Sequence, residues 1–392
     1  MPLRATGAEG VMPAPVAVAL PAAWRRFFTV PIDDVKGIPA LEAVRGIAAS
    51  LVFLVHFQAA FGRLLLPRGS SPMRVGAYLA QVGYHGVDVF FVLSGFLIYG
   101  SLMGRPTRLL TFFRRRVRRI YPTFLAVLGI YLLLGFVFPA RSKLPPDGTL
   151  LYVLKNALLL PGVFKVKPII TVAWSLSYEI FFYIGLGCIV AGLRLRSWPR
   201  PVRIAFVLGW LLVWVLAGTY VQHLAKSFVL FLPGILVWEI SSIERVHRWL
   251  GRIPSALVWG VFLFAVCSVP LLRRQPALAG VLTASLTPAT LVFCVLAFGI
   301  GVFVLCASNR TSPVSRSLSS RPLRAIGIAS YSFYLIHGLV TNTVAMVFWG
   351  LAGQRLFANG PLIYAALMPV VYLACVAGAV ALFQLVERPA SL

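Results

Sequence analysis

The sequence predicts an all-α, polytopic membrane protein with about ten transmembrane helices. Of its 392 residues, 59% are hydrophobic and only 12% are charged, whereas soluble domains carry about 25% charged residues. The mean hydropathy is +0.89, and apolar runs repeatedly reach the ~20 residues that one crossing needs. The net charge of +26 would otherwise suggest a nucleic-acid partner. We exclude that partner because the charge follows a membrane topology.

Ten apolar stretches are long enough to be transmembrane helices. They lie near 41–61, 83–103, 119–138, 171–193, 203–221, 226–243, 253–271, 279–306, 326–350 and 362–386. The apolar segment 150–163 contains Lys155 and Asn156 and ends at Pro161-Gly162, so we expect a short re-entrant or interfacial helix there. If that segment crossed the membrane, the chain would have eleven spans and its later part would be inverted.

Basic residues predict the orientation of these spans. With the N-terminus in the cytoplasm, inside segments contain 24 Lys and Arg residues and outside segments contain 12. Cytoplasmic loops of membrane proteins carry such an excess, so we expect both termini in the cytoplasm. The chain then divides into a cytoplasmic N-terminal tail (1–36), a membrane domain (37–389) and a C-terminal tail (390–392).

The five cysteines predict no cross-links and no metal centre. All of them fall within predicted spans and none has the spacing of metal ligands. We therefore expect no disulfide, no metal site and no permanently bound cofactor.

Arg45 and His56, in the first predicted span, are the leading functional candidates. Their separation of eleven residues is almost three turns, so both side chains project from one helix face, ~16 Å apart along the axis. Ionisable side chains at membrane depth are costly and by default functional, and His exchanges a proton near neutral pH. The alternative is an Arg that extends to the headgroups and a His hydrogen-bonded to another helix.

The second predicted span carries Asp88 near its start and the small pair Ser94-Gly95 in its middle. An intramembrane Asp is a further functional candidate. Small residues allow a ligand or another helix to approach the backbone closely. Helix packing therefore explains the small pair as well as ligand binding does, but it explains Asp88 less well.

A basic run at 114–119 follows that span and contains Arg115, Arg116 and Arg119. Membrane topology alone would account for such a loop. However, Arg116 and Arg119 are three residues apart and would share a helix face, and guanidinium groups bind phosphates through two parallel hydrogen bonds. The run therefore predicts a site for a phosphorylated cytoplasmic ligand.

Two polar stripes follow in later spans. Ser175, Glu179 and Tyr183 are spaced four apart and form one ridge, where a buried Glu binds a proton, orients a base or forms a structural ion pair with an Arg. Ser330, Tyr334 and His337 share another helix face. For His337, a hydrogen bond between helices is as good an explanation as catalysis.

Taken together, these residues resemble membrane acyltransferase family 3, the bacterial O-acyltransferases of surface polysaccharides and related acceptors. The resemblance covers roughly residues 37–389, with Glu42 at a position where the family usually has Asp. It rests on motifs in the family's order: the pair Arg45 and His56, Gly86–Phe96, Arg119–Pro122, Trp174–Glu179, Ser330–His337 and Glu387–Pro389.

The resemblance implies an enzyme, an O-acetyltransferase that moves an acetyl group from cytoplasmic acetyl-CoA to a hydroxyl of a glycan or another hydroxylated acceptor. The expected location is the inner membrane of a bacterium. The expected partners are the acyl-CoA, the acceptor and the bilayer, with no nucleic acid. A proton- or ion-coupled transporter is the main alternative, since it would also use intramembrane ionisable groups. A non-catalytic flippase or receptor is a third.

Each candidate residue then has an expected role. Arg116, Arg119 and Arg115, with Ser94 and Gly95, would bind the donor. His56 would act as the general base on the acceptor hydroxyl, because burial favours its neutral form, and an acyl-histidine intermediate stays open. Glu179 would fix the His56 tautomer or relay the proton. Arg45 and Asp88 complete the predicted catalytic set, and Ser175, Tyr183, Tyr334 and His337 are further candidates.

Overall fold

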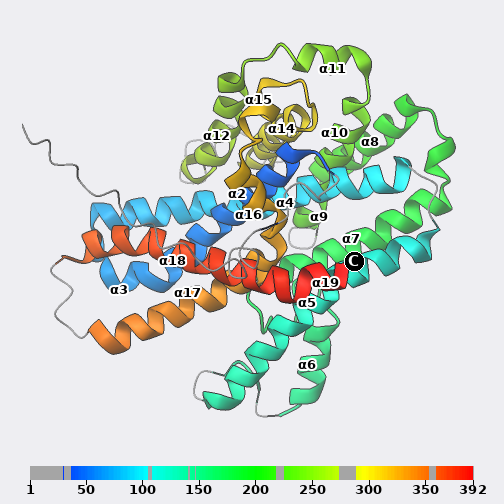
Figure 1. Cartoon of the computed structure of the whole chain (residues 1–392). Coiled ribbons are helices and arrows are strands. Elements are labelled where there is room, and N and C mark those ends of the chain that lie inside the picture. The colour runs from blue at the N-terminus through cyan, green and yellow to red at the C-terminus, as the bar shows by residue number, and fades with distance from the viewer. Residues whose placement is uncertain are drawn as a thin grey trace, which may run out of the picture.

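The structure, a computed structural model, describes residue 30 and residues 37–104, 108–139, 142–145, 147–217, 225–272, 288–352 and 359–391. They form helices joined by turns and loops, with one isolated bridge between Pro161 and Phe164 (Figure 1). The helices are α2 (Pro39–Phe57), η1 (Gln58–Gly62), α3 (Arg63–Leu65), α4 (Ser71–Gly104), α5 (Leu109–Val137), α6 (Thr149–Ala157), α7 (Ala173–Gly192), η3 (Leu195–Ser197), α8 (Arg200–Ala217), α9 (Ala225–Val229), α10 (Phe231–Ser241), α11 (Glu244–Leu250), α12 (Ser255–Leu272), α14 (Pro288–Ser308), α15 (Pro313–Ser317), α16 (Arg321–Ile328), α17 (Ser330–Ala352), α18 (Gly360–Leu382), η5 (Phe383–Glu387) and α19 (Arg388–Ser391). The predicted helical class is confirmed. The predicted tail 1–36 lies outside the described residues, except for residue 30.

Six helical stretches among the described residues are long and apolar enough to cross a membrane. They are Pro39–Leu65, Ser71–Gly104, Leu109–Val137, Ala173–Gly192, Ser330–Gly350 and Gly360–Ala390. A seventh span would be formed by Ser227–Ser241 and Glu244–Leu250, a pair bent by 100°. The chain is thus an integral membrane protein with several candidate spans.

The predicted number of ten spans is not confirmed. The difference concerns the predicted spans 203–221, 253–271 and 279–306. The described parts of the last two are the shorter apolar helices Ser255–Leu271 and Val292–Ser308. The first falls on α8, which is not among the qualifying helices, and the end of that predicted span lies outside the described residues.

The segment 150–163 forms a short helix, as predicted. Helix α6 has nine residues, fewer than half of the ~20 that one crossing needs. The chain then turns back through Gly162, whose φ of +98° favours glycine, and Tyr178 of α7 donates a hydrogen bond of 2.9 Å to the Gly162 carbonyl. The helix is thus too short to cross the membrane by itself, and the chain that follows it is tied to α7.

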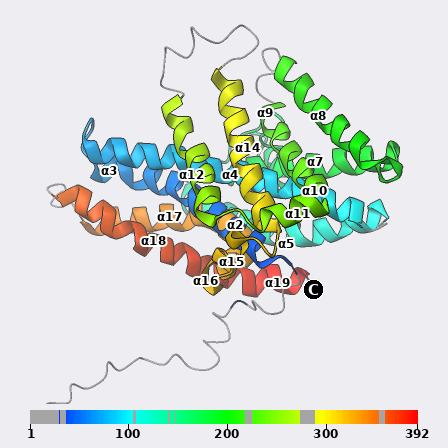
Figure 2. The same ribbon diagram turned by 90° about the horizontal axis from the view of Figure 1, so that it is seen from above.

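Helix α2 occupies a central position because small residues let its neighbours approach closely. A Cβ on Gly86 of α4 would lie 2.4 Å from the carbonyl oxygen of Ala48, and one on Gly327 of α16 would lie 1.8 Å from that of Glu42. Helix α17 also packs against α2, and it lies beside α18 (Figure 2). These contacts fix the helix that carries Arg45 and His56.

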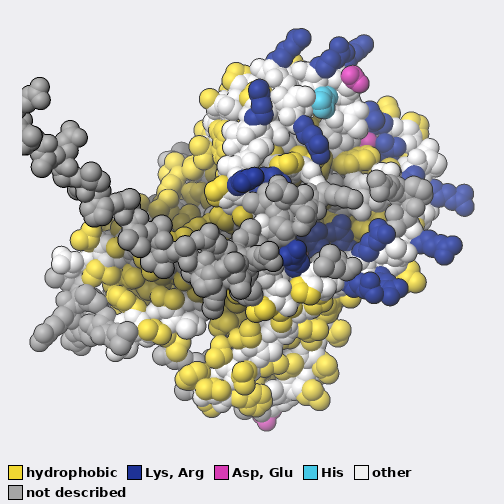
Figure 3. Space-filling view, in the orientation of Figure 1, with side chains coloured by type: hydrophobic (Ala, Val, Ile, Leu, Met, Phe, Trp, Pro, Cys, Tyr) yellow, Lys and Arg dark blue, Asp and Glu magenta, His cyan; other side chains and the backbone are white. Residues whose placement is uncertain are grey.

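Charged and apolar surfaces are separated on the face drawn in Figure 3. The visible Lys and Arg side chains gather over the upper and right-hand part, whereas the part over α6 and the C-terminal end of α5 is almost entirely apolar. Such a separation is expected of a chain that lies in a bilayer, because charged side chains avoid hydrocarbon.

Candidate active site

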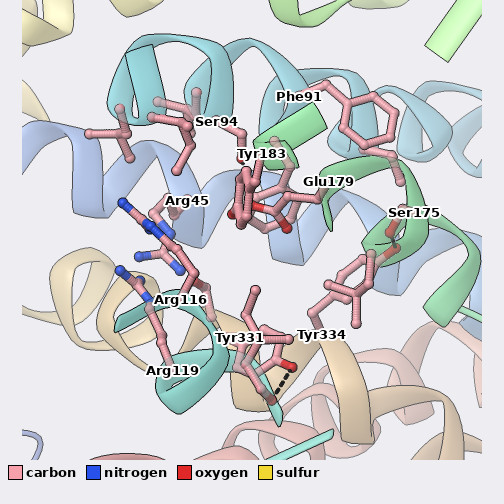
Figure 4. A pocket seen from close by; sticks show the side chains of 18 residues that line it. Arg45, Phe91, Ser94, Arg116, Arg119, Ser175, Glu179, Tyr183, Tyr331 and Tyr334 are labelled. Atoms are coloured by element: carbon pink, nitrogen blue, oxygen red, sulfur yellow. Dashed lines mark hydrogen bonds between the residues drawn. The ribbon is translucent and has the colours of Figure 1, made fainter. Parts of the chain in front are cut away.

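A narrow cavity of about 90 Å³ lies between α2, α4, α5, α7 and α17 (Figure 4). We call it the arginine cavity. It collects side chains from five helices, so most of the separate sequence motifs meet at one place. Of the thirteen predicted site residues, eight line it: Arg45, Ser94, Arg116, Arg119, Ser175, Glu179, Tyr183 and Tyr334.

Three arginines, Arg45, Arg116 and Arg119, form one side of the cavity (Figure 4). The Arg116 guanidinium lies 5.6 Å from the ring centre of Phe112 and 5.5 Å from that of Tyr183, and such contacts orient its planar group. No described carboxylate lies within 4 Å of any of the three guanidinium groups. This side of the cavity therefore carries positive charge suited to an anionic ligand.

Glu179 lies on another side of the cavity and is held by its neighbours. Ser94 donates a hydrogen bond of 2.8 Å to Oε1 of Glu179, and the Tyr183 hydroxyl donates to the same oxygen. The second carboxylate oxygen, Oε2, has no donor among the described residues. The predicted ridge thus forms, and its carboxylate partly balances the three arginines.

The end of the cavity opposite the arginines is closed by a Ser175–Tyr334 pair. Their hydroxyl groups lie 2.7 Å apart, and the Tyr334 hydroxyl also donates to the Val172 carbonyl at 3.1 Å. Tyr331 lines the cavity as well, a position that the sequence analysis did not single out, and its hydroxyl donates to the Ile120 carbonyl at 2.8 Å. The sequence signal that could have identified Tyr331 was its place within the Ser330–His337 motif.

His56 and His337 lie outside the arginine cavity and contact each other. Their ring centres are 4.8 Å apart, and His337 is also 6.0 Å from the ring of Tyr334. His337 is fully buried, and its Nδ1 lies 3.0 Å from the Phe333 carbonyl. A carbonyl only accepts, so Nδ1 carries the hydrogen, and Nε2 is left as a buried acceptor without a partner among the described residues.

The expected contact between Glu179 and His56 does not form in the structure. Glu179 is bonded to Ser94 and Tyr183, whereas the ring beside His56 is that of His337. The reason is geometric: Glu179 faces the same cavity as Arg45, and His56 lies almost three turns farther along α2.

Asp88, Gly95 and Arg115 do not line the arginine cavity either. Asp88 accepts a hydrogen bond of 2.6 Å from Nδ1 of the buried His85, on the same helix. Gly95 faces α10, where a Cβ would lie 2.0 Å from the Phe231 carbonyl oxygen, so the role visible here is helix packing. Arg115 is exposed.

Comparison with known proteins agrees with this set of motifs. An acyltransferase-domain family model matches residues 38–380. The exopolysaccharide production protein ExoZ of Rhizobium meliloti is 30% identical over 315 residues, which cover 79% of this chain and 89% of that protein. The acyltransferase MdmB of Streptomyces mycarofaciens is 26% identical over 77% of this chain and 79% of its own length.

A more distant relative is the O-acetyltransferase OatA of Staphylococcus aureus. It is 22% identical over 76% of this chain, a stretch that makes up 50% of that protein. No solved structure matches the chain. A helical membrane domain with these motifs defines a membrane acyltransferase. The family match shows that the chain belongs to acyltransferase family 3, as the sequence motifs predicted.

Proposed function

We propose that this protein is an O-acyltransferase that transfers an acetyl group from cytoplasmic acetyl-CoA to a hydroxyl of a glycan or another hydroxylated acceptor. The observation that carries this proposal is the arginine cavity, where three guanidinium groups with no described carboxylate within 4 Å face the hydrogen-bonded Glu179. Family membership supports the reaction type. The names of OatA and ExoZ support O-acetyl transfer and a polysaccharide acceptor.

The size of the cavity limits how the donor would bind. Its volume of about 90 Å³ is well below the roughly 300–1,000 Å³ of cavities that enclose a whole ligand. Arg119 is exposed and Arg116 is half-buried. The phosphate groups of CoA would therefore bind near Arg119, at the mouth, while the thin pantetheine arm carries the thioester inward past Arg45.

The chemical step would use His56 as the general base. The acceptor hydroxyl gives its proton to the neutral imidazole while its oxygen bonds to the thioester carbonyl carbon. The carbon–sulfur bond then breaks, and the proton passes from His56 to the departing CoA thiolate. His337, whose Nδ1 is held by the Phe333 carbonyl, would position the His56 ring from the side.

The orientation of the chain belongs to the same proposal. Ten spans with both termini in the cytoplasm would place the basic run of α5, and with it the mouth of the arginine cavity, at the cytoplasmic face of the inner membrane. That face is where acetyl-CoA is available. Glu179 would then neutralise part of the arginine charge when the site is empty.

The direct test uses the purified protein in liposomes with acetyl-CoA labelled in the acetyl group and a panel of lipid-linked glycans and hydroxylated small molecules. We expect release of the CoA thiol in step with label on an acceptor hydroxyl. A transporter would instead move a solute without consuming the thioester. Absence of both thiol release and labelled product across the panel would refute the proposal.

A further inference from the structure

A second, larger cavity of about 730 Å³ lies farther along α5 and α17, two of the helices that line the arginine cavity. We call it the distal cavity. Its walls come from η1, the C-terminal parts of α5 and α17, and the loop that contains Ser142 and Lys143. This volume falls within the range of roughly 300–1,000 Å³ in which proteins bind small ligands.

The two cavities follow one another along three helical stretches. On the stretch formed by α2 and η1, Arg45 lines the arginine cavity and Ala59 lines the distal cavity. Ala59 is fourteen residues, or roughly 20 Å, farther along. On α5 the corresponding residues are Ile120 and Tyr131. On α17, Tyr334 lines the first cavity, and the second begins only at Leu339.

The histidine pair lies between the two cavities. His56 precedes Ala59 and Ala60, which line the distal cavity, by about one turn. The Lys143 ammonium, which lines the distal cavity, is near enough to interact electrostatically with the His56 ring. On its other side, His337 of the pair lies beside Tyr334, which lines the arginine cavity. A group bound in the distal cavity would thus approach the proposed base from the side opposite the donor.

Among the described residues that line the distal cavity, Lys143 is the charged one. Its Nζ donates to the Ile169 carbonyl at 3.0 Å and to Oγ1 of Thr171 at 2.8 Å, and it lies 5.9 Å from the ring centre of Tyr131. An ammonium has three donors, so one remains available. No described carboxylate lies within 4 Å of it.

The distribution of lysines in the sequence also places positive charge in the segment that contains Lys143. Of the six lysines in the chain, four lie between residues 143 and 167, although the chain otherwise uses Arg for its positive charge. In the proposed topology this loop is outside, where basic residues oppose the usual charge bias. The cluster, Lys143, Lys155, Lys165 and Lys167, is accompanied there by a single acidic residue, Asp147.

We propose that the distal cavity binds the acceptor, and that Lys143 selects acceptors that carry an anionic group, a carboxylate or a phosphate, near the reacting hydroxyl. The uncharged polar lining groups of Ser142, Asn342 and Thr343 suit hydroxyl recognition. This inference rests on the proposed acyltransferase function, and it assigns that function a substrate class.

The test compares the binding of two short glycans that differ only in charge, a tetrasaccharide with glucuronate units and its neutral glucose counterpart. The protein is held in nanodiscs of zwitterionic phosphatidylcholine, so that lipid charge does not contribute. We expect wild type to bind the uronate probe about tenfold or more tightly than the neutral probe. Lys143→Gln should abolish this preference, and a phosphorylated glucose tetrasaccharide shows whether phosphate replaces carboxylate.

Two matched variants keep the test specific. Lys167→Gln removes an exposed lysine of the same loop that does not line the cavity, so it should keep the preference. Thr343→Trp fills the distal cavity from the exposed side of α17, so it should abolish probe binding and leave CoA binding intact.

Several results would overturn the inference. These are equal affinity for the charged and neutral probes, no binding of either, or an unchanged preference in Lys143→Gln. Acetyl-CoA turnover measured on the same preparation distinguishes a failure of this inference from a failure of the proposed function. Turnover without any charge preference defeats this inference alone, whereas absence of turnover across the acceptor panel defeats the proposed function.

Discussion

Replacing Arg119 with Lys separates donor binding from membrane topology. The change keeps the positive charge and therefore the signal that orients the membrane protein, but it removes the guanidinium fork that would hold a CoA phosphate. Arg119 lines the mouth of the arginine cavity and has no described carboxylate within 4 Å, so its donors are available to a ligand.

The expected effect follows from the loss of one charged hydrogen bond. Such a bond contributes about 1.5–3 kcal/mol, which corresponds to a rise of roughly tenfold to a hundredfold in the KM for acetyl-CoA. The KM for the acceptor should change little. The assay is steady-state CoA thiol release at a fixed acceptor concentration, with reporter fusions to verify orientation.

A control on the same helix makes the result interpretable. Arg118 is exposed and does not line the cavity, so Arg118→Lys should leave donor kinetics unchanged. Arg116→Lys should behave like Arg119→Lys and also lose its contacts with Phe112 and Tyr183. If both cavity variants had wild-type donor kinetics, the run 114–119 would be a topological signal without a part in the reaction.

Three further predictions follow from the packing, the topology and the charge of the loop. Gly327→Ala places a Cβ 1.8 Å from the Glu42 carbonyl oxygen and should destabilise the protein by about 1–3 kcal/mol in thermal unfolding. Gly129→Ala, with open space around it, should not, and equal stability of the two variants would contradict the close contact. Reporter fusions after residues 145 and 200 should lie outside and inside, respectively; an outside location of the second would invert the later spans. Partial burial lowers the pKa of the Lys143 ammonium, so the preference for the uronate probe should be present at neutral pH and lost as the pH rises through that pKa. Lys143→Arg should retain the preference to higher pH, and a preference in wild type that does not change with pH would show that Lys143 is not its source.

The convergence of distant motifs was the most predictable part of the site. Spacing alone placed Ser175, Glu179 and Tyr183 on one helix face, and the structure lines one cavity with all three. Spacing within a helix depends only on 3.6 residues per turn, so it is readable from the sequence. The family motifs then indicated that the separate helices would contribute to one site.

Contacts between helices were harder to predict. The periodicity of α2 put Arg45 and His56 on one face but did not show that only Arg45 would reach the arginine cavity, or that His337 would lie beside His56. Such pairings depend on helix crossing positions, which are set by close contacts such as that of Gly95 with α10. The pairing of Asp88 with His85 was missed for a different reason. It is a local contact between side chains three residues apart on one helix, so the spacing in the sequence could have indicated it.

The number of spans was difficult to predict from the sequence, because apolar stretches break into shorter helices. The stretch 226–243 becomes α9 and α10, and the chain then bends by 100° before α11. Hydropathy sums over a window and does not register such a bend. For the same reason, it did not register the π-helical segment η1, through which the first span continues to Leu65.

The most direct test of the account is transfer from labelled acetyl-CoA by His56→Ala at a protein level matched to wild type. A general base contributes about 10²–10⁴-fold, so we expect a loss of that size with folding and membrane level intact. His337→Ala should lose less, and His247→Ala, at an exposed histidine of α11, should retain wild-type activity. Transfer by His56→Ala within a few-fold of wild type would contradict the account, because no proton acceptor would then be needed at the junction of the two cavities.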